Sequence, residues 1–376
     1  MIVEKTGKGV KCMRRKYLDN IRWMTVALVV VYHVLYIFNA QGVLGGMTPF
    51  SDVQYQDVLL PLVYPWFMAL LFIVSGMSVR FYLEKHTAKE FRHSRTVKLL
   101  VPSTLGLLVF FWIAGWVNMT ISHAFETMSG VPGPILYLIM CLSGTGPLWY
   151  IQLLWVFSMA LLLIRRIEKD RLYNVCANVR LPVLIALAAP VWAAAQVLNT
   201  PVVTVYRFGL YGICFLLGYF VFAHDEVIAR VEKACVPLAV VAAVLGVVYV
   251  CLTFGHNYAE EPALSNPLAV GYLWITCLAI LGCMKRFGDR STPLTDFMNR
   301  ESWGLYVFHY LPLSACALLL RTKTDLPAAA VYALTAVAAF AGAFALYHIV
   351  SRIPVLRFLT LGIENPGKRK ERNHAA

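Results

Sequence analysis

The stretch YLDNIRWMTVALVVVYHVLYIF, residues 17–38, is apolar along most of its length, but it carries an arginine near its start and a histidine deep inside. As an α-helix it would place Arg22 and His33 roughly three turns plus 20° apart, or about 16 Å along one face. The two side chains would point the same way without touching. If the segment crosses a membrane, Arg22 lies at one mouth and His33 lies at a second, deeper level.

The composition indicates that the segment does cross a membrane. Hydrophobic residues make up 59% of the 376-residue chain, charged residues 14%, and the mean hydropathy is +0.66. Soluble domains are far more polar than this. We predict one all-α integral membrane domain over residues 1–376, a bundle of about ten transmembrane helices, most of them near the roughly 17–25 residues needed for a span. The predicted spans are residues 20–38, 58–83, 99–121, 147–164, 181–198, 207–223, 235–254, 267–284, 301–320 and 327–350.

Basic residues indicate the orientation. If the N-terminus is cytoplasmic and the side alternates at each span, the inward segments hold 28 of the 33 Lys and Arg residues and the outward loops hold three. The positive-inside rule predicts this asymmetry, so both termini are expected in the cytoplasm. The net charge of +13 then faces anionic lipid rather than nucleic acid. The nine cysteines are scattered without a CxxC pair, which predicts neither a disulfide framework nor a metal site. The apolar residues 135–142 are too few to span and are expected to be interfacial or re-entrant.

Ionisable residues inside the spans are the candidates for chemistry, because they are costly to bury in a bilayer. Arg22 has a structural explanation, in which it reaches toward headgroups and pairs with Asp19 on the same helix face. His33 could be a structural histidine between helices, or a base that titrates near neutral pH. His309 lies near the middle of the ninth span, and Glu301 is expected in the first turn of that span.

Several motifs then occur in the order of one family. Arg22 and His33 match the R-x10-H signature in the first helix of the membrane-bound acyltransferase family 3, which the chain resembles over nearly its whole length. Mild departures are Met77 for the usual Phe after SG, Lys98 for the second Arg of a basic pair, and Trp303 for Tyr or Phe. The run YPWFMALLFIVSG further resembles the branch that contains glucan biosynthesis protein C. The other matching segments are LLFIVSGMSV (70–79), RTVKLLVP (95–102), GPLWYIQLLWVF (146–157) and SWGLYVFHYLP (302–312).

The resemblance implies an enzyme in the bacterial cytoplasmic membrane. It would transfer an acyl group, acetyl or succinyl, from cytoplasmic acyl-CoA to a hydroxyl of an extracytoplasmic carbohydrate or glycolipid. Acyl-CoA would be a co-substrate, and no bound cofactor or metal is implied. Arg22, helped by Arg95 and Lys98, would hold the donor. His33 would act as general base or as transient acyl acceptor, and His309 would orient it or bind the acceptor.

Three further residues are candidates for substrate contacts. Ser75 or Tyr306 could donate to the developing oxyanion. Trp149 is a candidate for substrate binding, although tryptophan near a span end is also typical of the interfacial aromatic belt. The competing function is a transporter or flippase without bond chemistry, and a receptor-like or scaffolding protein is a third. The sequence shows no paired, interrupted spans in matching halves and no intramembrane acidic cluster for ion coupling, which favours the enzyme.

Overall fold

The computed structural model describes residues 15–200 and 205–364. Expectations for the basic residues within 1–14 and 365–376 lie outside the described residues. Within them the chain is all-α, with no strand, as predicted. The first helices are α1 (Lys16–Tyr36), α2 (Leu59–Val63), α3 (Phe67–Leu83), α4 (Ala88–Arg95), α5 (Trp112–Ile121), α6 (Ala124–Thr127), α7 (Gly133–Ser143), α8 (Trp149–Glu168), α9 (Arg171–Cys176), α10 (Leu181–Ala186) and α11 (Ala188–Ala194). The remaining helices are α12 (Phe208–Phe220), α13 (Asp225–Lys233), α14 (Cys235–Thr253), α15 (Pro267–Phe287), α16 (Pro293–Phe308), α17 (Tyr310–Lys323), α18 (Ala328–Arg352) and α19 (Pro354–Leu361).

The described helices include six that are long and apolar enough to cross a membrane. Two bent pairs, α12 with α13 at 107° and α16 with α17 at 55°, would raise the number to eight. The protein is therefore a multi-pass membrane protein, and the count of ten stays a prediction. The six single spans are Lys16–Tyr36, Tyr55–Leu83, Gly146–Glu168, Cys235–Thr253, Pro267–Phe287 and Ala328–Arg352.

Two predicted spans, 99–121 and 181–198, match neither a single span nor a bent pair, and each contains a proline. The predicted span 99–121 begins at the end of one π-helical turn, Thr96–Leu100, and contains Pro102 and a second π-helical turn, Leu107–Phe111. The apolar helix there runs only over Leu107–Ile121. In 181–198, Pro190 lacks the N–H that would bond the carbonyl of Ala186, where α10 ends. Both segments are therefore shorter helices than the hydropathy pattern predicts.

The ninth predicted span also begins elsewhere. α16 starts at Pro293, after Thr292, whose side chain accepts a hydrogen bond from the Thr295 N–H. Glu301 is therefore more than two turns inside the helix, and the expectation that it lies in the first turn is wrong. Its buried carboxylate accepts a hydrogen bond from Arg300 Nε at 3.0 Å. Hydropathy missed the first two turns of α16 because they are polar.

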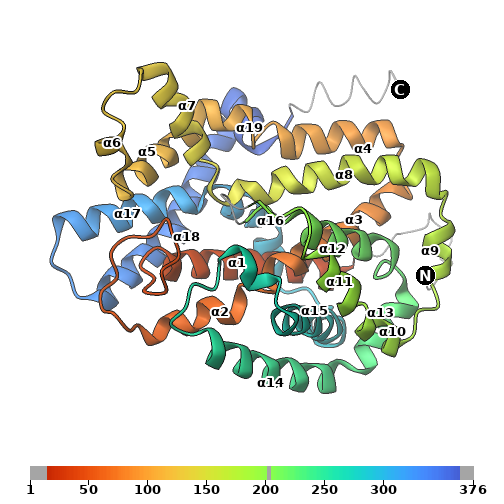
Figure 1. Cartoon of the computed structure of the whole chain (residues 1–376). Helices are drawn as coiled ribbons and strands as arrows, with labels where there is room; N and C mark the ends of the chain where they lie inside the picture. The colour runs from red at the N-terminus through yellow and green to blue at the C-terminus, as the bar shows by residue number, and fades with distance from the viewer. Residues whose placement is uncertain (1–14, 201–204, 365–376) are drawn as a thin grey trace.

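Contacts between loops place the start of α1 and several other segments at one edge of the molecule, here called the N-terminal edge. Arg15 forms a bidentate ion pair with Asp225 at the start of α13. Arg80, near the end of α3, pairs with Asp170 after α8 at 2.6 Å. These are segments that the charge pattern assigns to one side. In Figure 1, α9 and α13 lie at the right, and the loops after α1 and α17 lie at the left.

The loops predicted to face outward contact one another at the opposite edge. Asn257 Nδ2 donates to the Gly42 carbonyl at 3.2 Å, and Arg321 Nη2 donates to the Thr48 carbonyl at 3.2 Å. The loop after α1 folds back on its own helix, because the Ala40 N–H donates to the carboxylate of Asp57 at 2.8 Å. Loops that the charge pattern assigns to the outer side thus lie together, while the side of the membrane that they face stays a prediction.

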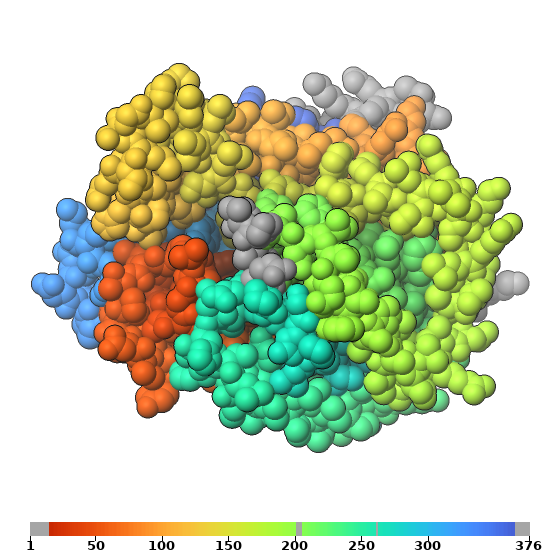
Figure 2. Space-filling view, in the orientation of Figure 1, coloured from red at the N-terminus to blue at the C-terminus, as the bar shows by residue number. Residues whose placement is uncertain are grey.

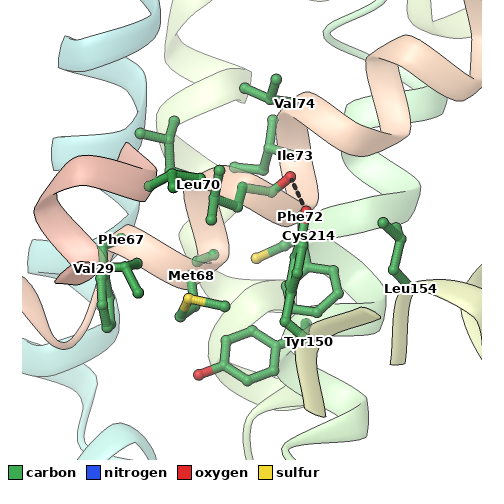
Figure 3. Packing of buried hydrophobic residues seen from close by; sticks show 14 of the residues in the cluster. Val29, Phe67, Met68, Leu70, Phe72, Ile73, Val74, Tyr150, Leu154 and Cys214 are labelled. Carbon is green, nitrogen blue, oxygen red and sulfur yellow. Dashed lines mark hydrogen bonds between the residues drawn. The ribbon is translucent and has the colours of Figure 1, made fainter. Parts of the chain in front are cut away.

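Close contact between α3 and α12 forms part of the core. A Cβ added to Gly76 would lie 2.0 Å from the Phe215 carbonyl oxygen, and one added to Gly218 would lie 2.1 Å from that of Ile73. Only glycine allows these backbones to approach so closely, a common feature of membrane helix pairs. Around the contact, Phe72 packs edge-on against Tyr150 of α8 at 4.7 Å between ring centroids (Figure 3). This packing fixes α3, which carries two of the serines described below.

α5 and α7 form an apolar hairpin at the upper left of Figure 1. The two helices approach closely, because a Cβ on Gly115 would lie 1.7 Å from the Met140 carbonyl oxygen. α7 covers the predicted segment 135–142. Its 11 residues extend about 16 Å, too short to cross about 30 Å of hydrocarbon. Whether the segment is interfacial or re-entrant stays a prediction.

Candidate functional site

α1 carries the two residues with which the sequence analysis began. It is one continuous helix over Lys16–Tyr36, so Arg22 and His33 lie on one face as expected, about 16 Å apart along the axis. The helix packs against α3, α15, α16 and α18. In Figure 1 it crosses the middle of the bundle. The two side chains therefore face protein rather than lipid along most of the helix.

Arg22 joins α1 to α3 near the N-terminal edge. Its Nη1 donates to the Asp19 carboxylate at 2.6 Å, the pairing that the sequence predicted. Its Nη2 donates to the hydroxyl of Ser78, which in turn donates to the Val74 carbonyl at 2.6 Å. The Arg22 side chain keeps 36% of its surface exposed, so part of the guanidinium is open to a ligand.

Arg95 and Lys98 have Arg22 as an electrostatic neighbour. Arg95, at the end of α4, is within electrostatic reach of Arg22, and both cations reach the Lys98 ammonium. Lys98 Nζ also lies over the ring of Trp303 at 5.2 Å from its centroid. Three basic side chains from α1, α4 and the following π-helical turn therefore form one group, here called the cation cluster.

His33 and His309 form the second group, here called the histidine pair. Nε2 of His309 lies 3.2 Å from Nδ1 of His33, across 276 residues of sequence. Nδ1 of His309 lies 3.1 Å from the Leu305 carbonyl oxygen and 2.9 Å from that of Tyr306. Because a carbonyl oxygen can only accept, Nδ1 of His309 carries the hydrogen.

The tautomers of the pair follow from these contacts. In a neutral imidazole one nitrogen donates and the other accepts. Nε2 of neutral His309 therefore accepts from the Nδ1–H of His33, and Nε2 of His33 carries a lone pair. His309 is fully buried, whereas His33 is only half-buried. The free nitrogen thus belongs to the more accessible ring of the two.

Aromatic rings surround His33. The ring centroids of Tyr32 and Tyr310 lie 5.3 Å from that of His33, and the Tyr36 centroid lies 6.0 Å away, all three edge-on. The 55° bend between α16 and α17 occurs at His309, since Pro312 cannot donate to the Phe308 carbonyl. The bend brings Tyr310 and His309 to the same imidazole.

The Ser75 hydroxyl lies beside the cation cluster, whereas Tyr306 is next to the histidine pair, with its ring centroid 6.5 Å from that of His309. Ser75 Oγ is 2.8 Å from the Tyr150 hydroxyl, which is within electrostatic reach of Arg22 and Arg95, so Ser75 belongs beside the cation cluster. The Tyr306 hydroxyl donates to the Pro147 carbonyl and so joins α16 to the short turn Gly146–Leu148 before α8.

Trp149 packs against Tyr211, with ring centroids 5.5 Å apart. Sequence reasoning missed Ser78, Tyr150 and Tyr310 as members of these groups. Ser78 follows Ser75 by about one helical turn, and Tyr310 directly follows His309, so their positions next to predicted residues could have identified both.

A family model described as an acyltransferase domain matches residues 15–348, most of the chain. The chain belongs to this acyltransferase family. The matched range contains both Arg22 and His309, and therefore the whole of the two groups described above. No curated protein and no solved structure matches the chain.

The protein is thus a multi-pass membrane acyltransferase, an enzyme that transfers groups other than aminoacyl groups. An acyltransferase needs a binding place for the activated acyl donor and a group that handles the proton of the acceptor. The cation cluster and the histidine pair are the two groups whose chemistry suits these tasks. Among the described residues no three His, Cys, Asp or Glu side chains converge as a metal site would require.

Proposed function

We propose that this acyltransferase moves an acetyl or succinyl group from acyl-CoA, bound at the cytoplasmic side, to a hydroxyl of an extracytoplasmic carbohydrate or glycolipid. The observation that carries the proposal is the free Nε2 of His33, held in that tautomer by His309. In the orientation predicted from the basic residues, the N-terminal edge is cytoplasmic and both ends of the chain lie on that side. The membrane is the bacterial cytoplasmic membrane. Acyl-CoA is a co-substrate and not a resident cofactor.

The cation cluster serves the donor. A CoA thioester carries its negative charges on the nucleotide and cannot enter hydrocarbon, whereas its pantetheine arm is thin enough to pass between helices. Arg22 offers planar, permanently charged donors for phosphate or pantetheine oxygens, and Arg95 and Lys98 add charge beside it. The thioester can then extend toward His33 along the face of α1.

The histidine pair serves the acceptor. A sugar hydroxyl gives its proton to Nε2 of His33 as its oxygen attacks the thioester carbon, and the C–S bond breaks to release the CoA thiolate. The imidazolium returns the proton to the sulfur. In the covalent route, Nε2 itself attacks the carbon and the CoA thiolate leaves. The acceptor oxygen then attacks the acyl carbon, the C–N bond breaks, and the hydroxyl proton passes to the Nε2 that is freed and from there to the thiolate. Both routes use the same free nitrogen.

The Ser75 hydroxyl, which forms a hydrogen bond with the Tyr150 hydroxyl, is the candidate donor to the oxyanion. Tyr306 is less suited, since its hydroxyl hydrogen is engaged by the Pro147 carbonyl. Trp149 has no polar contact among the described residues and contributes an aromatic face to the packing around Tyr211. Membership of the branch that contains glucan biosynthesis protein C, and hence succinyl over acetyl, is supported by the YPWFMALLFIVSG run and by the overall span pattern.

The test compares surface glycans and glycolipids by mass spectrometry from cells that express the wild type, His33→Ala, or His123→Ala at equal membrane levels. His123 is an exposed histidine on the α5–α7 hairpin, which makes it the matched control. We expect an ester-sized mass increment with the wild type and with His123→Ala, and its loss with His33→Ala. Wild-type levels of the ester with His33→Ala would refute the role of His33. A transporter would instead alter the location of a solute and leave no new ester.

A further inference from the structure

A basic cavity of about 460 Å³ opens at the N-terminal edge, between α4 and the C-terminal end of α8. The two helices lie side by side at the upper right of Figure 1, and they are neighbours on the surface in Figure 2, α4 in orange and α8 in yellow-green. The volume falls within the range of roughly 300–1,000 Å³ that small-molecule sites occupy. The lining residues are Ala88, Lys89, Arg92, Leu162, Arg165, Arg166, Lys169 and Asp170.

Five of these eight lining residues are cations, and the one acid is already paired. Asp170 accepts a hydrogen bond from Arg80 Nη1 at 2.6 Å, and Glu84 pairs with Arg80 Nε at 3.2 Å. Arg80 is itself fixed over the Tyr173 ring at 3.6 Å.

Two further carboxylates near the cavity are also engaged. Hydrogen bonds from the backbone N–H and the hydroxyl of Thr87 lower the pKa of Glu90, which forms a capping box with Thr87, the N-cap of α4. Glu168 accepts from the backbone N–H groups of Asp170 and Tyr173. None of the five lining cations pairs with a carboxylate within residues 15–200 and 205–364. The cavity is therefore an uncompensated cationic site, which favours a ligand with several negative charges.

A basic edge is expected of any membrane protein, since Lys and Arg face anionic headgroups. Two features set this site apart. Its cations converge on one hollow from two helices instead of spreading along the membrane surface. They also continue inward, because Lys89, Arg92, Arg95 and Lys98 recur at every third residue. Such a spacing places each cation near the previous one on the helix and about 4.5 Å further along.

This series leads from the cavity to the cation cluster. Lys89 and Arg92 line the cavity, whereas Arg95 and Lys98 are the members of the cluster that lie beside Arg22. α8 is held against the same segment, because the Trp155 Nε1–H donates to the Thr96 hydroxyl at 3.2 Å. Ala88 and Leu162 add an apolar patch against which a base could lie. The segment of α4 and the π-helical turn after it therefore connects this cationic cavity to the proposed donor site.

We propose that this cavity binds the phosphate-bearing nucleotide end of the acyl donor, with the pantetheine arm directed along α4 toward Arg22. The inference rests on the proposed function and adds to it a second, separate binding region for the donor. The shared chemistry is recognition of several phosphate groups by Lys and Arg. An anionic lipid headgroup is the other source of that chemistry, and the experiment separates the two.

The experiment measures CoA and pantetheine binding to the purified full-length protein in phosphatidylcholine nanodiscs by isothermal titration calorimetry. The cavity variant is Lys89→Gln/Arg165→Gln. The matched control is Arg171→Gln/Arg180→Gln, which removes two exposed cations from the same edge outside the cavity. We expect the cavity variant to weaken CoA binding by about tenfold or more, roughly one or two charge-assisted contacts. Pantetheine binding should stay unchanged, and the control should bind CoA like the wild type.

Three other results would overturn the inference. Equal CoA affinity of wild type and cavity variant would place the nucleotide elsewhere and leave the proposed function intact. A cavity variant that binds CoA normally but loses co-purifying phosphatidylglycerol would assign the cavity to a lipid headgroup. If the wild type bound neither CoA nor acetyl-CoA or succinyl-CoA, the acyl-CoA donor of the proposed function would fail along with the cavity.

Discussion

Arg22 and His33 share one face of α1, yet their surroundings differ in almost every respect. Arg22 lies near the N-terminal edge, keeps 36% of its side chain exposed, and has charged neighbours of both signs. His33 contacts another imidazole and three tyrosines, and no carboxylate approaches it among the described residues. The long, charged side chain of Arg22, which is partly exposed, is suited to binding an anionic ligand. A fixed neutral imidazole suits proton transfer at a deeper level.

Because their surroundings differ, we expect substitutions in the two groups to change different kinetic constants. Removing a group that interacts with the substrate only in the transition state lowers kcat, whereas removing a group that binds the substrate raises KM. Separate values of kcat and KM therefore test the assignment of donor binding to Arg22 and proton transfer to His33 more directly than total activity does.

The largest effect is expected for His33→Ala in the purified protein. We expect kcat to fall by about 10²–10⁴-fold, the usual contribution of a general base. The Kd for CoA should not change, since His33 lies about 16 Å from Arg22. Steady-state transfer assays and calorimetry on one preparation provide both numbers. A weakened Kd with normal kcat would reverse the assignment of the two groups.

A smaller effect is expected for Arg22→Ala. Loss of hydrogen bonds from a charged group should raise the donor KM by about 10–100-fold with little change in kcat. Arg22→Lys keeps the charge but not the planar donors, so it should recover only part of the affinity. Donor-dependence curves for the three proteins check this order. A change confined to kcat would place Arg22 in the reacting centre instead.

The smallest effect is expected for His309→Ala. The change removes one neutral hydrogen bond to His33, so kcat should fall by about three- to tenfold. His309→Gln keeps an acceptor that can reach Nδ1 of His33, so it should restore much of the rate. Rates for both variants, together with their thermal midpoints, separate positioning from loss of fold. If Gln restored stability but not kcat, His309 would do more than orient its neighbour.

The sequence predicted the parts of this protein that depend on local pattern. Hydropathy located most of the long helices, and the spacing of Arg22 and His33 predicted their common face, whereas the alternation of sides inferred from the basic loops stays a prediction. The pairing of Arg22 with Asp19 followed from i, i+3 spacing on a helix.

Other parts depend on tertiary structure or on signals that hydropathy ignores. The start of α16 was marked by Thr292 and Pro293, but its first turns are polar, and Glu301 was misplaced for that reason. The contact between His33 and His309 spans 276 residues, and no single-sequence pattern determines which helices meet. The cavity between α4 and α8 was likewise hidden, because residues 84–98 read as a basic loop, whereas residues 88–95 form a helix that carries Lys89 and Arg92 of the lining.

The carbonyl oxygens that hold His309 have a consequence for the cell's energy supply. A pair of imidazoles partway across a membrane resembles a step in a proton wire, and a continuous wire would dissipate the transmembrane proton gradient. Nδ1 of His309 ends on the carbonyls of Leu305 and Tyr306, and a carbonyl oxygen cannot pass a proton onward. The pair therefore exchanges protons only at Nε2 of His33. In the proposed reaction, each proton that Nε2 takes from an acceptor would therefore return through the same nitrogen, so the pair would not conduct protons across the membrane.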